Sequence, residues 1–185
     1  MVGVAAIDAA DRGGLTVAIV GAECAGKTTL AQSLAAHYRA PWVPEFARAY
    51  LTGPTYTSDD VREIARGQHA AETAAAAGAP LLFADTDLVV IKVWWDVRFG
   101  GNDRWVDAAL ADALSARRRR AYVLSIPDIP WVADVLRENP DDRPALHERY
   151  LRLLQSLGVD YVEVGGSREE RSASAIRAVD AWINR

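Results

Sequence analysis

Several residue types are scarce in this chain of 185 residues, and each scarcity excludes a class of protein. A single cysteine, Cys24, excludes an internal disulfide framework and is typical of a reducing compartment. No apolar run approaches the roughly 20 residues that a membrane-spanning helix needs. The three histidines are scattered and form no cluster with metal-ligand spacing. We therefore expect a cytoplasmic protein with no membrane partner.

Lysine is also scarce, since Lys27 and Lys92 are the only two among 21 basic residues and the rest are arginine. A net charge of −4 gives no overall signature of nucleic-acid binding. The run Arg117–Arg120 falls between a helical pattern and a strand, where we expect a solvated helix end. These features predict no nucleic-acid partner. They leave open whether the protein is a homo-oligomer.

Residues 1–14 lack a basic stretch followed by an apolar one, so we expect no secretion signal and interpret them as a flexible N-terminal tail. Beyond them, apolar and β-branched runs alternate with helical patterns, which predicts an α/β fold with a five-stranded parallel sheet and helices on both faces. The strands are expected at 15–20, 41–43, 81–85, 121–126 and 160–164. The helices are expected at 57–77, 103–116, 144–157 and 169–183, and residues 57–60 offer an N-cap and an acidic first turn to the first of them.

Residues 21–28 read Gly-Ala-Glu-Cys-Ala-Gly-Lys-Thr and complete the phosphate-loop pattern G-x-x-x-x-G-K-[ST]. A strand-like run precedes the pattern and helical spacing follows it, which is the context that such a loop requires. Lys27 is expected to bridge the β- and γ-phosphates of ATP, and the Thr28 hydroxyl to ligate Mg²⁺. Cys24 is either a redox-sensitive thiol in the field of the loop or simply a small loop residue. The pattern predicts one P-loop domain over residues 15–185.

Two carboxylates, Asp85 and Asp87, end the apolar run at 81–85. Because Mg²⁺ takes hard oxygen ligands, we expect Asp85 on the metal side of the site. Asp87 either accepts the proton of an acceptor hydroxyl as a catalytic base or caps the helix that follows it. Lys92 either forms a structural ion pair or contacts the substrate or a phosphate.

A candidate acceptor site follows the second strand, where Glu45 and Arg48 share one face if the segment is helical. A planar heteroaromatic acceptor would stack on tryptophan and place its ribose hydroxyls on a carboxylate. The tryptophans available for stacking are Trp42, Trp94, Trp95 and Trp131, and the alternative for each is packing in the core. We expect Gln68 to lie on the polar surface of the long helix.

A lid is expected after the fourth strand, where the sequence P-D-I-P-W at 127–131 leads into a polar, proline-broken segment. Arg137 and Arg143 would stabilise charge on the transferred phosphoryl group if this segment is mobile, and are otherwise ordinary arginines of a solvent loop. Gly166 either brings the backbone to the adenine base or simply connects a strand to a helix.

Together, these segments resemble the ribosylnicotinamide kinase domain of NadR-type proteins over roughly residues 15–180. The shared motifs are G-x-x-x-x-G-K-T-T, P-E-F-A-R (44–48), T-x-D-D (57–60), I-A-x-G-Q (64–68), F-x-D-T-D (83–87), K-V (92–93) and P-D-I-P-W. The resemblance implies a P-loop kinase fold and transfer of the ATP γ-phosphate to the ribose 5′-hydroxyl of nicotinamide riboside. ATP and Mg²⁺ would then be held by Gly21, Ala22, Glu23, Cys24, Ala25, Gly26, Lys27, Thr28 and Thr29.

On the same resemblance, Asp85 and Asp87 serve the metal and the acceptor hydroxyl, Glu45 and Arg48 lie near the acceptor, and Arg137 and Arg143 belong to the lid. This sequence departs from the pattern at Val135, where glycine is expected, and it contains no H-x-G-H adenylyltransferase signature. The alternatives are a kinase for another nucleoside or small alcohol, and an ATP-binding regulatory protein without acceptor chemistry.

Overall fold

A computed structural model of the chain describes residues 13–133 and 141–185. Five parallel strands form one sheet in the order β2-β3-β1-β4-β5. They are β1 (Leu15–Val20), β2 (Trp42–Val43), β3 (Leu81–Asp85), β4 (Arg119–Ser125) and β5 (Asp160–Val164). The predicted α/β class and the five parallel strands are confirmed.

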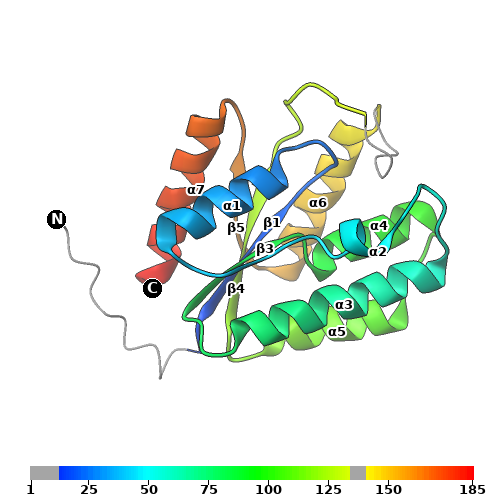
Figure 1. Cartoon of the computed structure of the whole chain (residues 1–185), viewed down its shortest axis with the longest axis horizontal. Helices are drawn as coiled ribbons and strands as arrows, with labels where there is room; N and C mark the ends of the chain where they lie inside the picture. The colour runs from blue at the N-terminus through cyan, green and yellow to red at the C-terminus, as the bar shows by residue number, and fades with distance from the viewer. Residues whose placement is uncertain (1–12, 134–140) are drawn as a thin grey trace.

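Both faces of the sheet are covered by helices, which explains why every residue of β1 is buried. Val17 and Ile19 point to one face, where they pack with α1 (Lys27–Tyr38) and α7 (Arg168–Ile183). Ala18 and Val20 point to the other face, towards α3 (Ser58–Ala76), α4 (Leu88–Arg98), α5 (Arg104–Ser115) and α6 (Arg143–Leu157). Figure 1 shows α1 and α7 on one side of the strands, with α3 and α5 on the other. The period-2 alternation of β1 therefore decides which helices each residue contacts.

Local signals set the helix ends. Thr57 accepts a hydrogen bond from the Asp60 N–H at 3.3 Å, while an Asp60 carboxylate oxygen accepts from the Thr57 N–H at 2.7 Å. This reciprocal capping box confirms the N-cap predicted for α3. The short helix α2 (Ala47–Tyr50) makes a single turn after β2.

The arginine run at the start of β4 is not the solvated helix end that we expected. Arg118 donates to the Thr16 hydroxyl at 2.7 Å and to the Ala79 carbonyl at 2.8 Å. Arg120 forms ion pairs in the interior, and its side chain is only 12 % exposed. The run leads into β4, so Arg118 and Arg120 turn inward to carbonyl and carboxylate groups, while Arg117 stays exposed.

This topology gathers the segments that follow the strands at one edge of the sheet. The loop after β1 and the turn after β3 meet there, because β1 and β3 are parallel neighbours with Ile19 paired to Asp85. Crevices at the carboxyl ends of parallel strands are the usual ligand sites of such sheets. In the described ranges, no helix is long and apolar enough to cross a membrane.

Candidate functional site

The phosphate-loop pattern lies between β1 and α1, in the context that the sequence predicted. Gly21 has φ +136° and Gly26 has φ +79°, values that side chains rarely adopt. Lys27 opens α1, and its ammonium donates to the Ala22 carbonyl of the same loop at 2.9 Å. The first turn of α1 carries no acidic residue, so its N-terminus retains the positive end of the helix dipole. The loop therefore has the geometry of an anion site.

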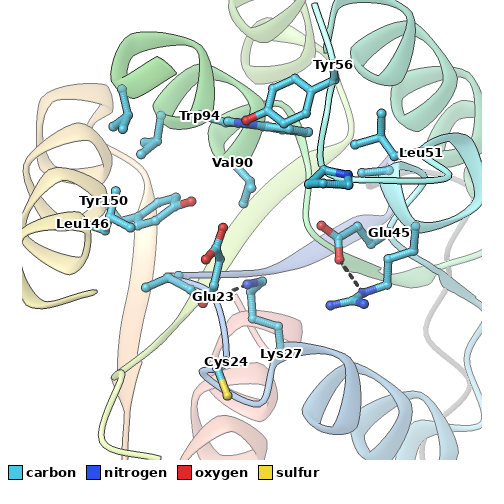
Figure 2. A pocket seen from close by; sticks show the side chains of 17 residues that line it. Glu23, Cys24, Lys27, Glu45, Leu51, Tyr56, Val90, Trp94, Leu146 and Tyr150 are labelled. Carbon is cyan, nitrogen blue, oxygen red and sulfur yellow. Dashed lines mark hydrogen bonds and ion pairs between the residues drawn. The ribbon is translucent and has the colours of Figure 1, made fainter. Parts of the chain in front are cut away.

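A pocket opens directly beside this loop, with about 880 Å³ of empty space that includes its open mouth. Its walls come from the phosphate loop, the segment from Glu45 to Tyr56, α4 and α6. Lys27 and Glu23 line the loop side, while Glu45 and Arg48 line the side next to α2 (Figure 2). The Glu45 carboxylate accepts from the Arg48 guanidinium at 3.0 Å. The predicted pair thus lines the same pocket as Lys27.

The far wall of the pocket is aromatic and apolar. Trp94 donates its indole N–H to the Tyr56 hydroxyl at 2.8 Å, and the two rings meet edge to face at 5.0 Å. Tyr150 and Leu146 of α6 and Val90 of α4 complete this wall (Figure 2). Burial raises the pKa of Tyr150, reinforced by the carboxylates of Glu45 and Glu23, so its hydroxyl stays protonated. The wall offers flat apolar surface with hydroxyl groups on it.

Of the four tryptophans considered for stacking, the structure places Trp94 at the pocket, whereas Trp95 is buried in the core. Trp42 instead packs with the apolar layer on the α1 face of the sheet. Trp131 lies beside Arg143, whose guanidinium is 5.7 Å from the ring centroid. Neither Trp42 nor Trp131 lines the pocket, so the geometry corrects their assignment to the acceptor. The sequence around each tryptophan does not show whether its side chain lines the pocket or packs in the core.

Asp85 lies at the end of β3 and is 1 % exposed, yet neither of its carboxylate oxygens has a hydrogen-bond partner among the described residues. Burial raises the pKa of Asp85, and it is opposed by the neighbouring Thr28 hydroxyl and by the charges of Lys27 and Arg48. An unpaired buried carboxylate is costly unless a ligand pairs with it. Asp85 and Thr28 therefore fit a Mg²⁺ ion as hard oxygen donors. The described residues contain no group of three or more His, Cys, Asp or Glu placed to hold a metal by themselves.

Asp87 has a different environment, and its predicted position facing an acceptor is not observed. One carboxylate oxygen accepts from the Val89 N–H at 2.9 Å, as the N-cap of α4. The other accepts from the Arg120 guanidinium at 3.0 Å. Asp87 is 1 % exposed and does not line the pocket. The capping alternative is the one that the structure shows.

Arg143 of the predicted lid and Gly166 of the predicted turn also form hydrogen bonds within the protein. Arg143 donates to the Ile129 carbonyl at 2.8 Å. The Gly166 N–H donates to an Asp128 carboxylate oxygen at 2.6 Å, so in this conformation it is not free for a base. Arg137 lies outside the described residues, as do Val135 and most of the predicted tail, so those predictions stay as they were.

The structure decides the alternative left open for Lys92 and gives the contacts of Cys24. Lys92 contacts the Asp107 carboxylate at 2.8 Å and the Asn102 side chain at 3.1 Å, which is the structural ion pair. The Cys24 thiol contacts the Pro130 carbonyl at 3.5 Å and accepts from the Val132 N–H at 3.4 Å. These contacts join the phosphate loop to the segment that follows β4.

Sequence reasoning missed Tyr56, Tyr150 and Arg171. Tyr56 directly precedes the N-cap of α3, a position that often packs against the helix, and this signal was available. Tyr150 lies four residues from Leu146 and Leu154, on the apolar face of α6. Arg171 is 4 % exposed and donates to the carbonyl of Ala25 at 3.3 Å, and no local pattern marks it. Through this bond, Arg171 of α7 supports the phosphate loop.

Residues 16–171 match the family described as AAA domain. The trifunctional NAD biosynthesis/regulator protein NadR of Salmonella typhimurium is 27% identical over 159 residues, which are 80% of this chain and 38% of that protein. Among solved structures, the NadR protein in complex with NR has a TM-score of 0.73 at 22% identity, covering 94% of this chain and 51% of that chain. The deoxyadenosine kinase of M. mycoides has a TM-score of 0.60 at 10% identity, covering 90% of this chain and 99% of that chain.

These likenesses confirm the predicted P-loop kinase fold and the predicted resemblance to NadR-type proteins. The chain spans less than two thirds of the NadR proteins that it matches. It is thus related to one part of those longer chains.

Proposed function

The chain belongs to the AAA domain family, and we propose that it is an ATP- and Mg²⁺-dependent kinase that phosphorylates the ribose 5′-hydroxyl of nicotinamide riboside. The observation that carries the proposal is the shared pocket, in which Lys27 of the phosphate loop and the aromatic wall around Trp94 face the same space. A triphosphate on the loop would point its terminal phosphate towards an acceptor bound in that pocket.

On the nucleotide side, Lys27 would exchange the Ala22 carbonyl for phosphate oxygens. Thr28 and Asp85 would hold Mg²⁺, which neutralises charge on the β- and γ-phosphates when it is bound. The unpartnered oxygens of Asp85 support this assignment, because a cation would supply their missing partner.

On the acceptor side, the ring of nicotinamide riboside is planar and positively charged. Trp94 and Tyr150 offer aromatic surface for such a ring, and the carboxylates of Glu23 and Glu45 line the same pocket. Glu45 takes the base role that the sequence assigned to Asp87, because it lines the pocket and Asp87 does not. A solved NadR relative is described in complex with NR, which supports the choice of acceptor.

A second candidate function is phosphorylation of another nucleoside on the same scaffold. The likeness to deoxyadenosine kinase favours it, since that protein is matched over 99% of its length. The two candidates share the nucleotide side and differ only in the ring that the aromatic wall accepts.

Incubation of the purified protein with Mg-ATP and nicotinamide riboside should give nicotinamide mononucleotide and ADP in equal amounts, as measured by liquid chromatography. Lys27→Ala should abolish turnover because it removes the charge between the phosphates. Lys92→Ala is the matched control. Lys92 forms a structural ion pair with Asp107, so its loss should leave the rate of turnover unchanged.

Turnover of a different nucleoside in place of nicotinamide riboside would favour the second candidate. ATP binding without turnover of any nucleoside in a panel would contradict both.

A further inference from the structure

The middle of α3 lies between the two segments that carry the acidic residues of the site. We expected Gln68 on the polar surface of this helix, but it is 1 % exposed. Its neighbour Gly67 approaches Phe46 so closely that an added Cβ would lie 2.4 Å from the phenyl ring. The I-A-x-G-Q motif at 64–68 thus places a glycine and an amide against the loop after β2.

The Gln68 amide makes two hydrogen bonds that join separate parts of the chain. Its carbonyl oxygen accepts from the Phe46 N–H at 2.9 Å, directly after Glu45. Its NH₂ donates to the Thr86 carbonyl at 3.3 Å, directly after Asp85. Thr86 has φ +72°, an unfavourable value for a β-branched residue that its surroundings must maintain.

One side chain therefore bridges the backbone beside the proposed base and the backbone beside the proposed metal ligand. Gln68 does not line the pocket, so its amide has no substrate to contact there. A donor and an acceptor on one planar group are needed for both bonds, and few side chains supply them. A hydrocarbon of equal length would fill the space and make neither bond.

We propose that Gln68 is a positioning residue, which holds the Glu45 carboxylate in register with Asp85 so that the acceptor hydroxyl and the metal-bound phosphate are aligned. This inference rests on the proposed kinase function and adds to it the coupling between the acceptor side and the metal side. It assigns Gln68 no direct contact with either substrate.

The first test is Gln68→Met, which keeps the length of the side chain and removes both hydrogen bonds. We expect kcat/KM for nicotinamide riboside to fall between about 10-fold and 100-fold, because small misplacements of reacting groups are costly. The KM for ATP should change by less than about twofold, since the phosphate loop itself is untouched. Thr73→Ala is the matched control on the same helix, because among the described residues the Thr73 hydroxyl bonds only to the His69 carbonyl.

The second test is Gln68→Glu, whose neutral carboxyl group offers one donor and one acceptor, as the amide does. Burial raises the pKa of such a carboxyl group, so it should be protonated at the lower pH values. Activity relative to the unmodified protein at the same pH should therefore rise as the pH falls from about 8 to about 6. Both proteins are compared in a Glu72→Gln background, because Glu72 interacts with Gln68 and its raised pKa of about 7 falls in the same window. In that background, a side chain that only fills space would show no such trend.

Several results would overturn the proposal. An increase in the KM for ATP as large as the loss in kcat/KM for nicotinamide riboside in a folded Gln68→Met protein would do so, as would unchanged kinetics. A flat pH ratio for Gln68→Glu would contradict the role of the two hydrogen bonds. Absence of turnover by the unmodified protein would contradict the proposed function and, with it, the positioning role of Gln68. Normal turnover by the unmodified protein, together with either variant result above, would contradict the positioning role alone.

Discussion

At the scale of single residues, Asp85 and Asp87 show how surroundings decide what a carboxylate does. Both are 1 % exposed, and burial raises the pKa of each. Asp87 has a cap contact and an arginine, so both of its oxygens are paired. Asp85 has no hydrogen-bond partner among the described residues and lies beside the phosphate loop. The same residue type is structural in one place and available to a ligand in the other.

The variants Asp85→Asn and Asp87→Asn should therefore have opposite effects. Asp85→Asn should abolish most Mg-ATP-dependent turnover and leave the free energy of unfolding of the ligand-free protein unchanged or higher, because burial is the largest influence on Asp85 and it disfavours the charge that the substitution removes. Asp87→Asn should lower the free energy of unfolding by about 3 kcal/mol, because it removes one charge of a buried ion pair. Urea unfolding and steady-state kinetics measure the two effects.

Each variant is the control for the other, since the two substitutions are chemically identical. A stable Asp87→Asn protein that binds ATP but fails to turn over would restore Asp87 as the base. A destabilised Asp85→Asn protein would contradict the assignment of the Asp85 carboxylate to a bound cation.

At the scale of the elements, one buried ion cluster joins α3, β4 and the start of α4. Arg120 of β4 donates to Glu72 of α3 at 2.8 Å and to Asp87 at 3.0 Å. Two carboxylates thus share one arginine in the interior. Burial raises the pKa of Glu72 to about 7, opposed by Arg120 and reinforced by Asp87.

This cluster should make stability depend on pH. The pKa of Glu72 in the folded protein lies above its ordinary value of 4.5, so the folded state holds a proton that the unfolded state releases. The contribution of Glu72 is therefore fully present below about pH 4.5 and is lost as the pH rises through about 7. Relative to Glu72→Gln, the unmodified protein should lose up to about 3 kcal/mol of stability over this window, at 1.36 kcal/mol per pH unit.

Urea unfolding at several pH values, for the unmodified protein and for Glu72→Gln, measures the difference directly. Carboxylates whose pKa is lowered by folding, such as Asp60, change stability at more acidic pH. They are present in both proteins, so their contribution drops out of the difference in stability. Parallel stability curves for the two proteins would contradict the prediction.

The elements themselves were largely predictable. The capping box at Thr57 and the buried run of β3 are local signals, and the structure reproduces both. The arginine run was predicted wrongly, because local charge cannot reveal that Glu72 and Asp87 lie opposite Arg120 in the fold. Gln68 was misplaced for the same reason, since its partners are 22 and 18 residues away along the chain.

At the scale of the whole molecule, the nucleotide would contact elements that follow β1 and β3 and would add contacts that the unfolded chain cannot make. Mg-ATP should therefore stabilise the fold, by about 2.7 kcal/mol at a concentration one hundred times its Kd. For a chain of this size, thermal unfolding should shift upward by roughly 5 to 10 °C. Lys27→Ala should lose most of this shift, and Lys92→Ala should keep it.

AMP is a useful control for the thermal shift, because it lacks the phosphates that the loop is expected to hold. An equal shift with AMP, or an unchanged shift in Lys27→Ala, would show that the nucleotide is not bound through the phosphate loop.

The sequence by itself determined the phosphate loop, the parallel sheet and the position of Asp85, because each depends on neighbours in the chain: glycines at fixed spacing, apolar runs, and an acid at a strand end. Only the tertiary structure decided that Asp87 faces Arg120 and that Glu45, Trp94 and Tyr150 share a pocket with Lys27. Those arrangements depend on strands and helices distant in sequence that pack side by side. Spacing along the chain does not specify which side chain then meets which.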